Sequence, residues 1–147
     1  MKDIKDLINE NKLTLSTLVV FTRAEHTIHK KEIETIKESG LTTAQFGVLE
    51  ALYNKGNLKI CELIEKILTT SGNITVVIKN LEKDGLIKRI EDPNDKRSCI
   101  ISLTDKGKDT IENILPYHIK NIENIFSILT DEEKITLKNI LKKFKNI

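Results

Sequence analysis

The sequence has 147 residues, of which 39% are hydrophobic and 31% are charged, and its formal net charge is +2. That length suits one domain with a modest core, and the composition excludes a disordered chain. Because 24 Lys and Arg residues nearly balance 22 Asp and Glu residues, any basic surface for a nucleic acid must be local.

The chain shows no sign of a membrane or secretory segment. No apolar run approaches the ~20 residues of a membrane span, and the N-terminal "MKDIKDLINENK" lacks a signal-peptide pattern. The two cysteines, Cys61 and Cys99, do not form a C-x-x-C pair. These features predict a cytoplasmic protein with reduced thiols and no membrane partner.

The first part of the chain is predicted to be helical. Aliphatic residues recur at helical spacing from Asp3 to about Glu38, and Gly40 ends that pattern. A second helix is expected to begin at Thr42, because Gln45 follows it at the spacing of a capping box. Gly56 ends this second helix.

The middle of the chain predicts a helix-turn-helix. A short β-like stretch, "NLKI", comes before a helix of roughly Cys61 to Leu68. The next helix is expected to have Thr70 or Ser71 as its N-cap and to end at Asp84. Gly85 would then supply the left-handed residue that commonly follows a helix.

After Gly85 the sequence predicts a β-hairpin and then two more helices. "LIKRIED" and "SCIISLT" are β-like runs, and Pro93 with Asn94 would form the turn between them. An apolar helical stripe then runs to Leu129, and "TDEEK" at Thr130 starts the last helix. This order predicts a mainly α fold with a small β-hairpin wing, in which 41–104 forms a winged helix.

The helix at 71–84 carries few charges for so charged a chain. Its apolar residues recur at i, i+3, i+4 and i+7 and predict a buried face: Ile74, Val77, Ile78 and Leu81. The opposite face has no acidic residue and is formed by Gly72, Thr75, Val76, Lys79 and Lys83, flanked by Asn73 and Asn80. Such a face suits a DNA major groove, because carboxylates would be repelled by phosphates. The alternative is a helix that is buried on both faces.

The hairpin tip supplies a second signal for DNA binding. Asp95, Lys96 and Arg97 follow the predicted turn. An arginine held there can enter a narrow minor groove, and Asp95 can orient its guanidinium. Lys88 and Arg89 on the first strand are candidate phosphate contacts. The alternative is an ordinary polar loop.

These features together resemble the MarR family of bacterial transcriptional regulators. The resemblance is carried by "LTTAQFGVLEAL", by the D-P-N-D-K-R segment with the following S-L-T-x-x-G, and by the long flanking helices, so it covers essentially the whole chain. It implies a homodimer that intertwines helices from 1–40 and 105–147 and binds a pseudo-palindromic operator in double-stranded DNA. The DNA contacts that it implies are Ser71, Gly72, Asn73, Thr75, Val76 and Lys79 on the helix, and Asp95 with Arg97 on the wing.

The resemblance also implies a small-molecule effector, which would bind between the dimer helices and the winged helix. Residues that could line such a pocket are Phe21, Arg23, His26, Phe46, Tyr53, Tyr117 and His118. For each of them an ordinary core or surface role is the alternative. The "SGNIT" segment is similar to that of a subgroup that responds to phenolic or quinone-like compounds.

The function predicted from the sequence is a homodimeric repressor that a small, phenolic ligand releases from its operator. A dimer is expected because the stripe from Ile111 to Leu129 is too long for one winged helix to cover; an intramolecular bundle is the alternative. A thiol-based sensor using Cys61 or Cys99 and a winged-helix module that binds protein instead of DNA are the alternative functions. No catalytic constellation, cofactor motif or metal-ligand spacing is recognised in the sequence.

Overall fold

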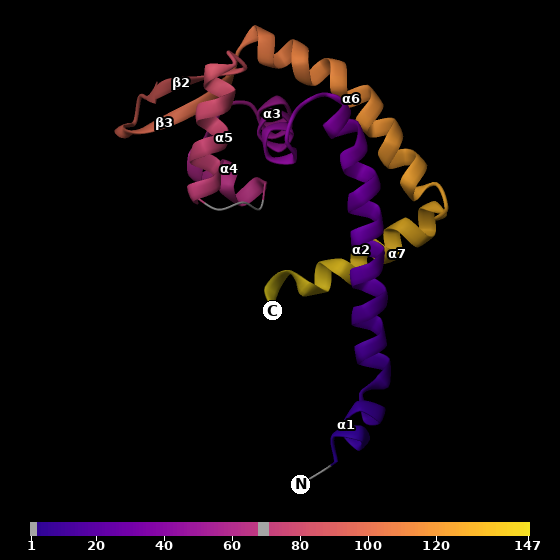
Figure 1. Cartoon of the computed structure of the whole chain (residues 1–147). Coiled ribbons are helices and arrows are strands. Elements are labelled where there is room, and N and C mark those ends of the chain that lie inside the picture. The colour runs from indigo at the N-terminus through magenta and orange to yellow at the C-terminus, as the bar shows by residue number, and fades with distance from the viewer. Residues whose placement is uncertain (1–2, 68–70) are drawn as a thin grey trace. The chain divides into compact units, whose positions relative to one another are not determined.

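The computed structural model describes residues 3–67 and 71–147, and it is mainly helical with a small antiparallel sheet (Figure 1). The predicted fold class is therefore confirmed. The elements in chain order are α1 (Ile4–Glu10), α2 (Lys12–Glu38), α3 (Thr43–Lys55), β1 (Leu58–Lys59), α4 (Ile60–Lys66), α5 (Ser71–Lys83), β2 (Ile87–Asp92), β3 (Asp95–Leu103), α6 (Asp105–Phe126), α7 (Asp131–Lys142) and a 3-10 turn (Lys143–Asn146). Thr70, one of the two predicted caps of α5, lies outside the described residues.

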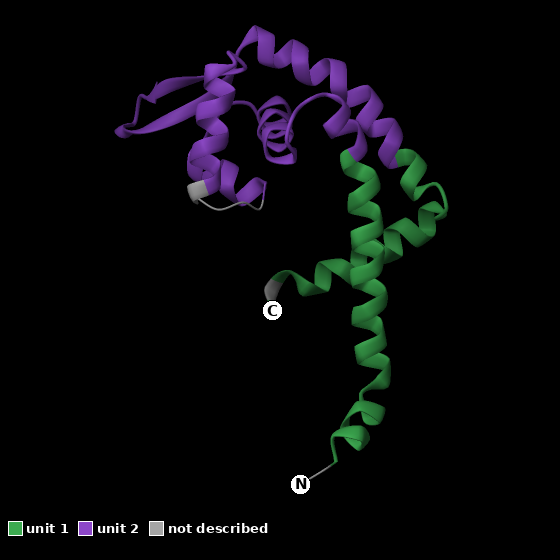
Figure 2. Cartoon of the chain, viewed as in Figure 1, with its two compact units in different colours: residues 1–33, 123–147 green, residues 34–122 purple. Residues whose placement is uncertain are grey.

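The chain divides into two compact units (Figure 2). One unit contains residues 34–122, and the other contains residues 1–33 together with 123–147. The 34–122 unit is larger than the winged helix predicted at 41–104, because Ile36 of α2 and Ile111 of α6 are buried in its core. The sequence pattern alone assigned those two helices wholly to dimerisation, and that assignment stays a prediction.

The core of the 34–122 unit is aliphatic apart from one phenylalanine. Its fully or almost fully buried side chains are Ile36, Phe46, Val48, Leu49, Leu52, Leu58, Leu63, Ile74, Val77, Ile78, Leu81, Leu86, Ile87, Ile101 and Ile111. They come from α2, α3, α4, α5, α6 and all three strands, so the core fixes the helix-turn-helix to the sheet. Burial of this kind stabilises a fold by roughly 25 cal/mol for each Å² of apolar surface removed from water.

The three-stranded sheet carries the wing, which we define as the β2–β3 hairpin, residues 87–103. Strand order is β1-β3-β2, and both pairings are antiparallel, with Leu58 opposite Ile101 and Ile87 opposite Leu103. The hairpin extends away from the helices α3, α4 and α5 (Figure 1). The predicted short strand at "NLKI" is thus the edge that joins the wing to the start of α4.

The predicted N-caps of α3 and α7 and the predicted glycine at the end of α5 are present. Thr42 Oγ1 accepts a hydrogen bond from Gln45 N at 3.1 Å, and Gln45 Oε1 accepts one from Thr42 N at 3.0 Å. Thr130 and Glu133 make the same reciprocal pair at the start of α7. Gly85 has φ +73°, and the Leu86 N–H donates to Leu81 O at 2.9 Å, which closes the end of α5 as expected.

A tight junction joins the end of α5, the last wing strand and the start of α6. Thr104 Oγ1 donates to Gly85 O at 2.6 Å and accepts from Gly107 N at 3.0 Å. A Cβ atom on Gly107 would lie 1.9 Å from Leu86 O, so no side chain fits there without a shift of the backbone. This close approach explains the glycine of the S-L-T-x-x-G segment.

The prediction of one N-terminal helix is wrong at Asn11. The chain forms α1 and α2 with Asn11 between them at φ −104° and ψ 12°. The Asn11 side-chain amide donates to Leu7 O at 2.8 Å and so competes with the helical backbone bond. A hydrophobic spacing pattern does not register this local competition.

The other unit, residues 1–33 and 123–147, has little core of its own. None of its described side chains is buried. Within residues 3–67 and 71–147, no helix is both long enough and apolar enough to span a bilayer.

Candidate nucleic-acid interface

The recognition helix predicted at 71–84 is α5, and its two faces differ as the spacing predicts. Ile74, Ile78 and Leu81 have no exposed surface, and Val77 is 7% exposed. The outer face of α5, defined here as Asn73, Thr75, Val76, Lys79, Asn80 and Lys83, is exposed to solvent. The alternative of a helix buried on both faces is therefore wrong for this chain.

The outer face of α5 contains no carboxylate, and Val76 at its centre is 58% exposed. The nearest acid of the helix, Glu82, is turned to the side and makes an ion pair of 3.0 Å with Arg89 on β2. α5 begins at Ser71, so Ser71 and Gly72 lie in its first turn, where backbone N–H groups have no helical acceptor. An anionic ligand would meet amides, hydroxyls and Lys79 on this surface, and it would meet no carboxylate that repels it.

Arg89 and Lys88, the candidate phosphate contacts on β2, are both exposed. Arg89 holds Glu82 and places its Nη1 3.8 Å from the sulfur of Cys99. The hydrogen bond with Glu82 is the main reason that the pKa of Arg89 is raised. Arg89 thus links β2 to the last turn of α5 at the surface.

The tip of the wing contains an irregularity that sequence inspection missed. Glu91 pairs with Cys99, but the next residue, Asp92, pairs with Asp95. Lys96, Arg97 and Ser98 therefore form a bulge on β3 with no opposite residue on β2. All three predicted wing residues, Asp95, Lys96 and Arg97, are exposed at this tip.

Asp95 contacts the backbone of Arg97, whereas the sequence analysis expected it to contact the guanidinium. Asp95 Oδ1 accepts a hydrogen bond from the Arg97 N–H at 2.9 Å. A short Asp side chain readily reaches the backbone amide two residues ahead, as in an Asx turn. This hydrogen bond therefore holds the backbone of the bulge at Arg97. It does not hold the guanidinium group itself.

Asp92 is a buried acid that the sequence analysis did not single out, and its side chain is 3% exposed. It accepts from Asn94 N at 2.9 Å and from Ser98 Oγ at 3.1 Å, and it pairs with Lys59 Nζ at 2.9 Å. The hydrogen bond from Asn94, followed by that from Lys59, holds the pKa of Asp92 below its ordinary value. The signal that could have identified it is the Asp-Pro-Asn turn itself, because Asp commonly accepts from the amide two residues on.

The predicted effector residues of the 34–122 unit are Phe46, Tyr53, Tyr117 and His118. Phe46 and His118 are both buried, and their ring centroids lie 4.6 Å apart. His118 Nδ1 is 3.0 Å from Thr35 Oγ1 of α2, so the imidazole bridges α2, α3 and α6. Phe46 and His118 therefore lie in contact inside the unit, where the imidazole is a polar group among apolar side chains.

Tyr53 and Tyr117 do not join that pair in the structure. Tyr53 is 40% exposed and donates its hydroxyl to Glu112 Oε1 at 3.0 Å, a bond that raises the pKa of Tyr53. Tyr117 is 73% exposed on α6. In the other unit, Phe21, Arg23 and His26 are exposed along α2. A pocket formed by these seven residues stays a prediction.

The two cysteines lie in separate places. Cys61 is exposed near the start of α4, and Cys99 is partly buried on β3 beside Arg89. Neither forms a disulfide in the structure.

Comparisons with known proteins match this geometry. The model of the MarR family matches residues 41–99, which include α3, α5 and most of the wing. The transcriptional regulator YkoM of Bacillus subtilis strain 168, of the helix-turn-helix type, is 40% identical over 124 residues, covering 84% of this chain and 80% of YkoM.

Two solved structures are similar over most of the chain. BpsR of Bordetella bronchiseptica, whose DNA binding is regulated by 6-hydroxynicotinic acid, has a TM-score of 0.77 and 25% identity, covering 89% of this chain and 99% of BpsR. The organohalide-sensing regulator RdhR, solved with bound 2,4-dichlorophenol, has a TM-score of 0.76 and 27% identity, covering 91% of this chain and 80% of RdhR.

Proposed function

The chain belongs to the MarR family of DNA-binding transcriptional regulators, and we propose that it acts as a homodimeric repressor that a small aromatic ligand releases from its operator. The observation that carries the proposal is the outer face of α5, which is exposed, free of carboxylates and centred on Val76. A face of this composition is suited to base edges and to thymine methyl groups in a major groove.

The wing would add a minor-groove contact to the contact made by α5. Arg97 is exposed in a bulge at the tip of the hairpin, beyond the core. The arginine side chain carries a permanent positive charge, and the potential of duplex DNA is most negative in a narrow minor groove. One subunit would therefore read a major groove with α5 and the adjacent minor groove with Arg97.

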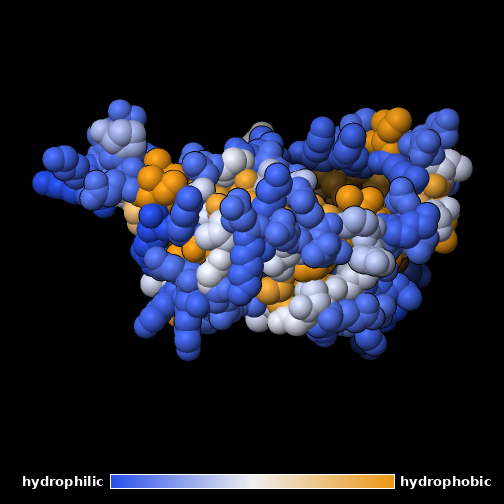
Figure 3. Space-filling view, turned by 90° about the horizontal axis from the view of Figure 1, so that it is seen from above, coloured by the Kyte–Doolittle hydropathy of each residue, from blue (hydrophilic) through white to orange (hydrophobic). Residues whose placement is uncertain are grey.

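A second copy of the chain is the proposed cover for the unit of residues 1–33 and 123–147. Its large apolar side chains are exposed and include Ile4, Leu7, Ile8, Leu13, Leu15, Leu18, Val19, Val20, Phe21, Ile128, Ile135, Leu137, Ile140, Leu141 and Phe144. On the one face of the molecule that Figure 3 draws, hydrophobic residues lie exposed among hydrophilic ones. So many large apolar side chains left exposed within one unit are typical of an interface and not of a monomer.

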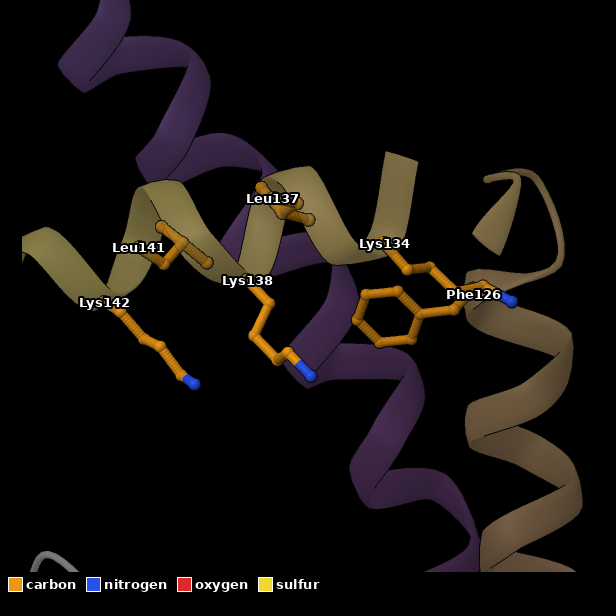
Figure 4. Close-up of a pocket in the computed structure, with 6 residues that line it drawn as sticks. All are labelled: Phe126, Lys134, Leu137, Lys138, Leu141 and Lys142. Carbon is orange, nitrogen blue, oxygen red and sulfur yellow. The ribbon is translucent and has the colours of Figure 1, made fainter. Parts of the chain in front are cut away.

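A hollow between the end of α6 and α7 in this unit fits the same interpretation. Phe126, Leu137 and Leu141 line an open groove of about 420 Å³, and three lysines border it (Figure 4). The lysines are Lys134, Lys138 and Lys142. Their stems can cover apolar surface while the amines stay in water. A partner helix could pack into this groove, and two-fold pairing would then present two copies of α5 to successive turns of DNA, ~34 Å apart.

An aromatic acid or a phenol is the proposed class of effector. BpsR and RdhR, which are similar over most of this chain, respond to or bind hydroxylated aromatic compounds. In this chain the Phe46–His118 pair could supply a ring face and a hydrogen-bonding nitrogen to such a ligand. Repression is the simplest direction of control, because occlusion of a promoter needs only the DNA-binding surface that the chain presents.

Selection of bound fragments from the host genome tests this function. We expect the purified protein to enrich a fragment that carries an inverted repeat and to release it when a hydroxylated benzoic acid or a chlorophenol is added. The affinity should fall steeply as salt increases, because phosphate contacts release counterions. If no fragment is enriched at low salt, the proposal is wrong and the protein-binding alternative gains support.

A further inference from the structure

The tip of the wing is held together by one buried carboxylate. Asp92 Oδ1 accepts from the backbone N–H of Asn94 in the turn, and Asp92 Oδ2 accepts from the Ser98 hydroxyl on β3. Lys59 Nζ lies 2.9 Å from Oδ2 and comes from β1, outside the hairpin. Three separate segments thus converge on a side chain that is 3% exposed.

The contacts of Asp92 enclose the bulge that carries Arg97. Asn94 lies before the bulge, Ser98 is its last residue, and Asp95 holds the Arg97 N–H at 2.9 Å within it. Because Lys96, Arg97 and Ser98 have no partner residues on β2, the strand ladder does not set their direction. Hydrogen bonds that the Asp92 and Asp95 carboxylates accept from Ser98 Oγ and Arg97 N therefore do so instead.

Lys59 connects this arrangement to the helix-turn-helix. Lys59 directly precedes α4, and its backbone N–H donates to Glu62 Oε2 at 2.7 Å in the first turn of that helix. Its amine pairs with Asp92, which raises the pKa of Lys59. The wing tip is therefore tied to the segment that leads into α4, and nearer its base the wing is linked to α5 through Arg89.

We propose that Asp92 is a positioning residue for DNA binding: it holds the Lys96–Ser98 bulge and so fixes the direction in which Arg97 enters the minor groove. The inference rests on the proposed function, because it needs the wing to contact DNA. Asp92 itself does not touch the duplex, since it is buried beneath the turn.

The sign of the effect separates this role from simple electrostatics. Asp92→Asn removes one negative charge from the DNA-binding unit, and that change alone should attract DNA more strongly. A positioning role predicts the opposite, weaker binding, because Asn has one acceptor oxygen and cannot accept both from Asn94 N on one side and from Ser98 and Lys59 on the other. Glu91→Gln is the matched control, because Glu91 is the exposed neighbour on β2 and loses the same charge.

The test is a double-mutant cycle of operator binding with wild type, Asp92→Asn, Arg97→Ala and the double variant. We expect Arg97→Ala to weaken binding by about 5- to 150-fold. Asp92→Asn should also weaken operator binding. Because Asp92 is proposed to act through Arg97, the double variant should bind within about twofold of Arg97→Ala alone, and twofold is the error within which independent effects add. Glu91→Gln should bind at least as tightly as wild type.

The proposal is overturned if the fold loss of operator affinity in the double variant equals the product of the two single losses. It is also overturned if Asp92→Asn binds the operator as tightly as Glu91→Gln does. Failure of the proposed function has a different result, because wild type itself would then bind no operator. Ser98→Ala gives the same cycle with a milder change should Asp92→Asn not fold. Trypsin provides a readout without DNA: cleavage after Lys96 and Arg97 should become faster in Asp92→Asn than in Glu91→Gln at equal melting temperature. Equal cleavage rates would contradict a role in holding the bulge.

Discussion

At the scale of single residues, the candidate interface combines exposed and buried side chains that lie close together in the sequence. Val76 is 58% exposed while Val77, one position later, is 7% exposed and part of the core. Arg97 is exposed while Asp92, five positions earlier in the same hairpin, is buried. The exposed residues are those that we propose to touch DNA, and the buried ones fix where the exposed ones point.

Arg97 should contribute one good groove contact. Replacement by alanine is expected to weaken operator binding by roughly 1–3 kcal/mol, as measured by fluorescence anisotropy on a labelled operator. Arg97→Lys keeps the charge but lacks the planar fork, so its loss should be intermediate. Wild-type affinity in Arg97→Ala would show that the wing tip does not reach DNA.

Asp92 should make the stability of the wing sensitive to acid. Because its pKa is lowered in the folded state from an ordinary value of 3.8, the stabilisation is complete above that value and is lost as pH falls through the folded-state pKa. Urea unfolding from about pH 5 downward should therefore show a gap between wild type and Asp92→Asn that closes toward low pH. A gap that stays constant over this range would contradict the assignment.

At the scale of secondary-structure elements, much of the arrangement could be predicted from periodicity and caps. The buried face of α5 follows from i, i+3, i+4 and i+7 spacing, and the start of α3 follows from Thr42 and Gln45. These signals are local, and the sequence contains them in full.

Other features could not be predicted, because they depend on contacts between distant segments. The Asp-Pro-Asn turn indicates only the hydrogen bond from Asn94 to Asp92, and the ion pair with Lys59, which comes from another strand, has no local signal in the sequence. His118 is buried because α2 and α3 cover it, although its neighbour Tyr117 is exposed. The break at Asn11 is local, but a hydrophobic spacing pattern does not weigh a side-chain amide against the helical backbone.

The junction of α5, the wing and α6 gives a prediction at this scale. Gly107→Ala places a Cβ against Leu86 O, so either α6 or the wing strand must move. We expect a destabilisation of about 1–3 kcal/mol, the usual cost of overpacking, in chemical unfolding followed by circular dichroism. Lys108→Ala, at the exposed position next to it, is the control and should change stability by less than ~0.5 kcal/mol. If Gly107→Ala and Lys108→Ala lose the same stability, the close approach of Gly107 to Leu86 O is contradicted.

At the scale of the whole molecule, the two units have different relations to solvent. The 34–122 unit buries a continuous core, whereas the unit of residues 1–33 and 123–147 exposes its apolar side chains. The first unit covers its large apolar side chains itself, and the exposed ones of the second are those that we propose a second copy covers. We propose that the difference reflects two roles, DNA binding by the first unit and dimerisation by the second.

A charge on the exposed apolar surface should therefore dissociate the protein. Leu18, which is 62% exposed on α2, is a suitable position. We expect Leu18→Glu to sediment as a monomer at concentrations where wild type is a dimer, because an unpaired carboxylate at an apolar interface is costly. Glu25→Gln, on the same helix but at a polar position, should leave the mass unchanged. If Leu18→Glu and wild type have the same mass, α2 is not in the interface.

The most direct test of the central claim is operator binding by Val76→Glu, compared with the isosteric Val76→Thr. Glutamate at the centre of the outer face of α5 would bring a carboxylate against phosphates and base acceptors, while the buried face is untouched. We predict that Val76→Glu keeps the wild-type melting temperature and oligomeric mass but loses operator affinity on the order of 100-fold, and that Val76→Thr stays near wild type. Operator binding by Val76→Glu that equals that of wild type would contradict the claim that this face reads DNA.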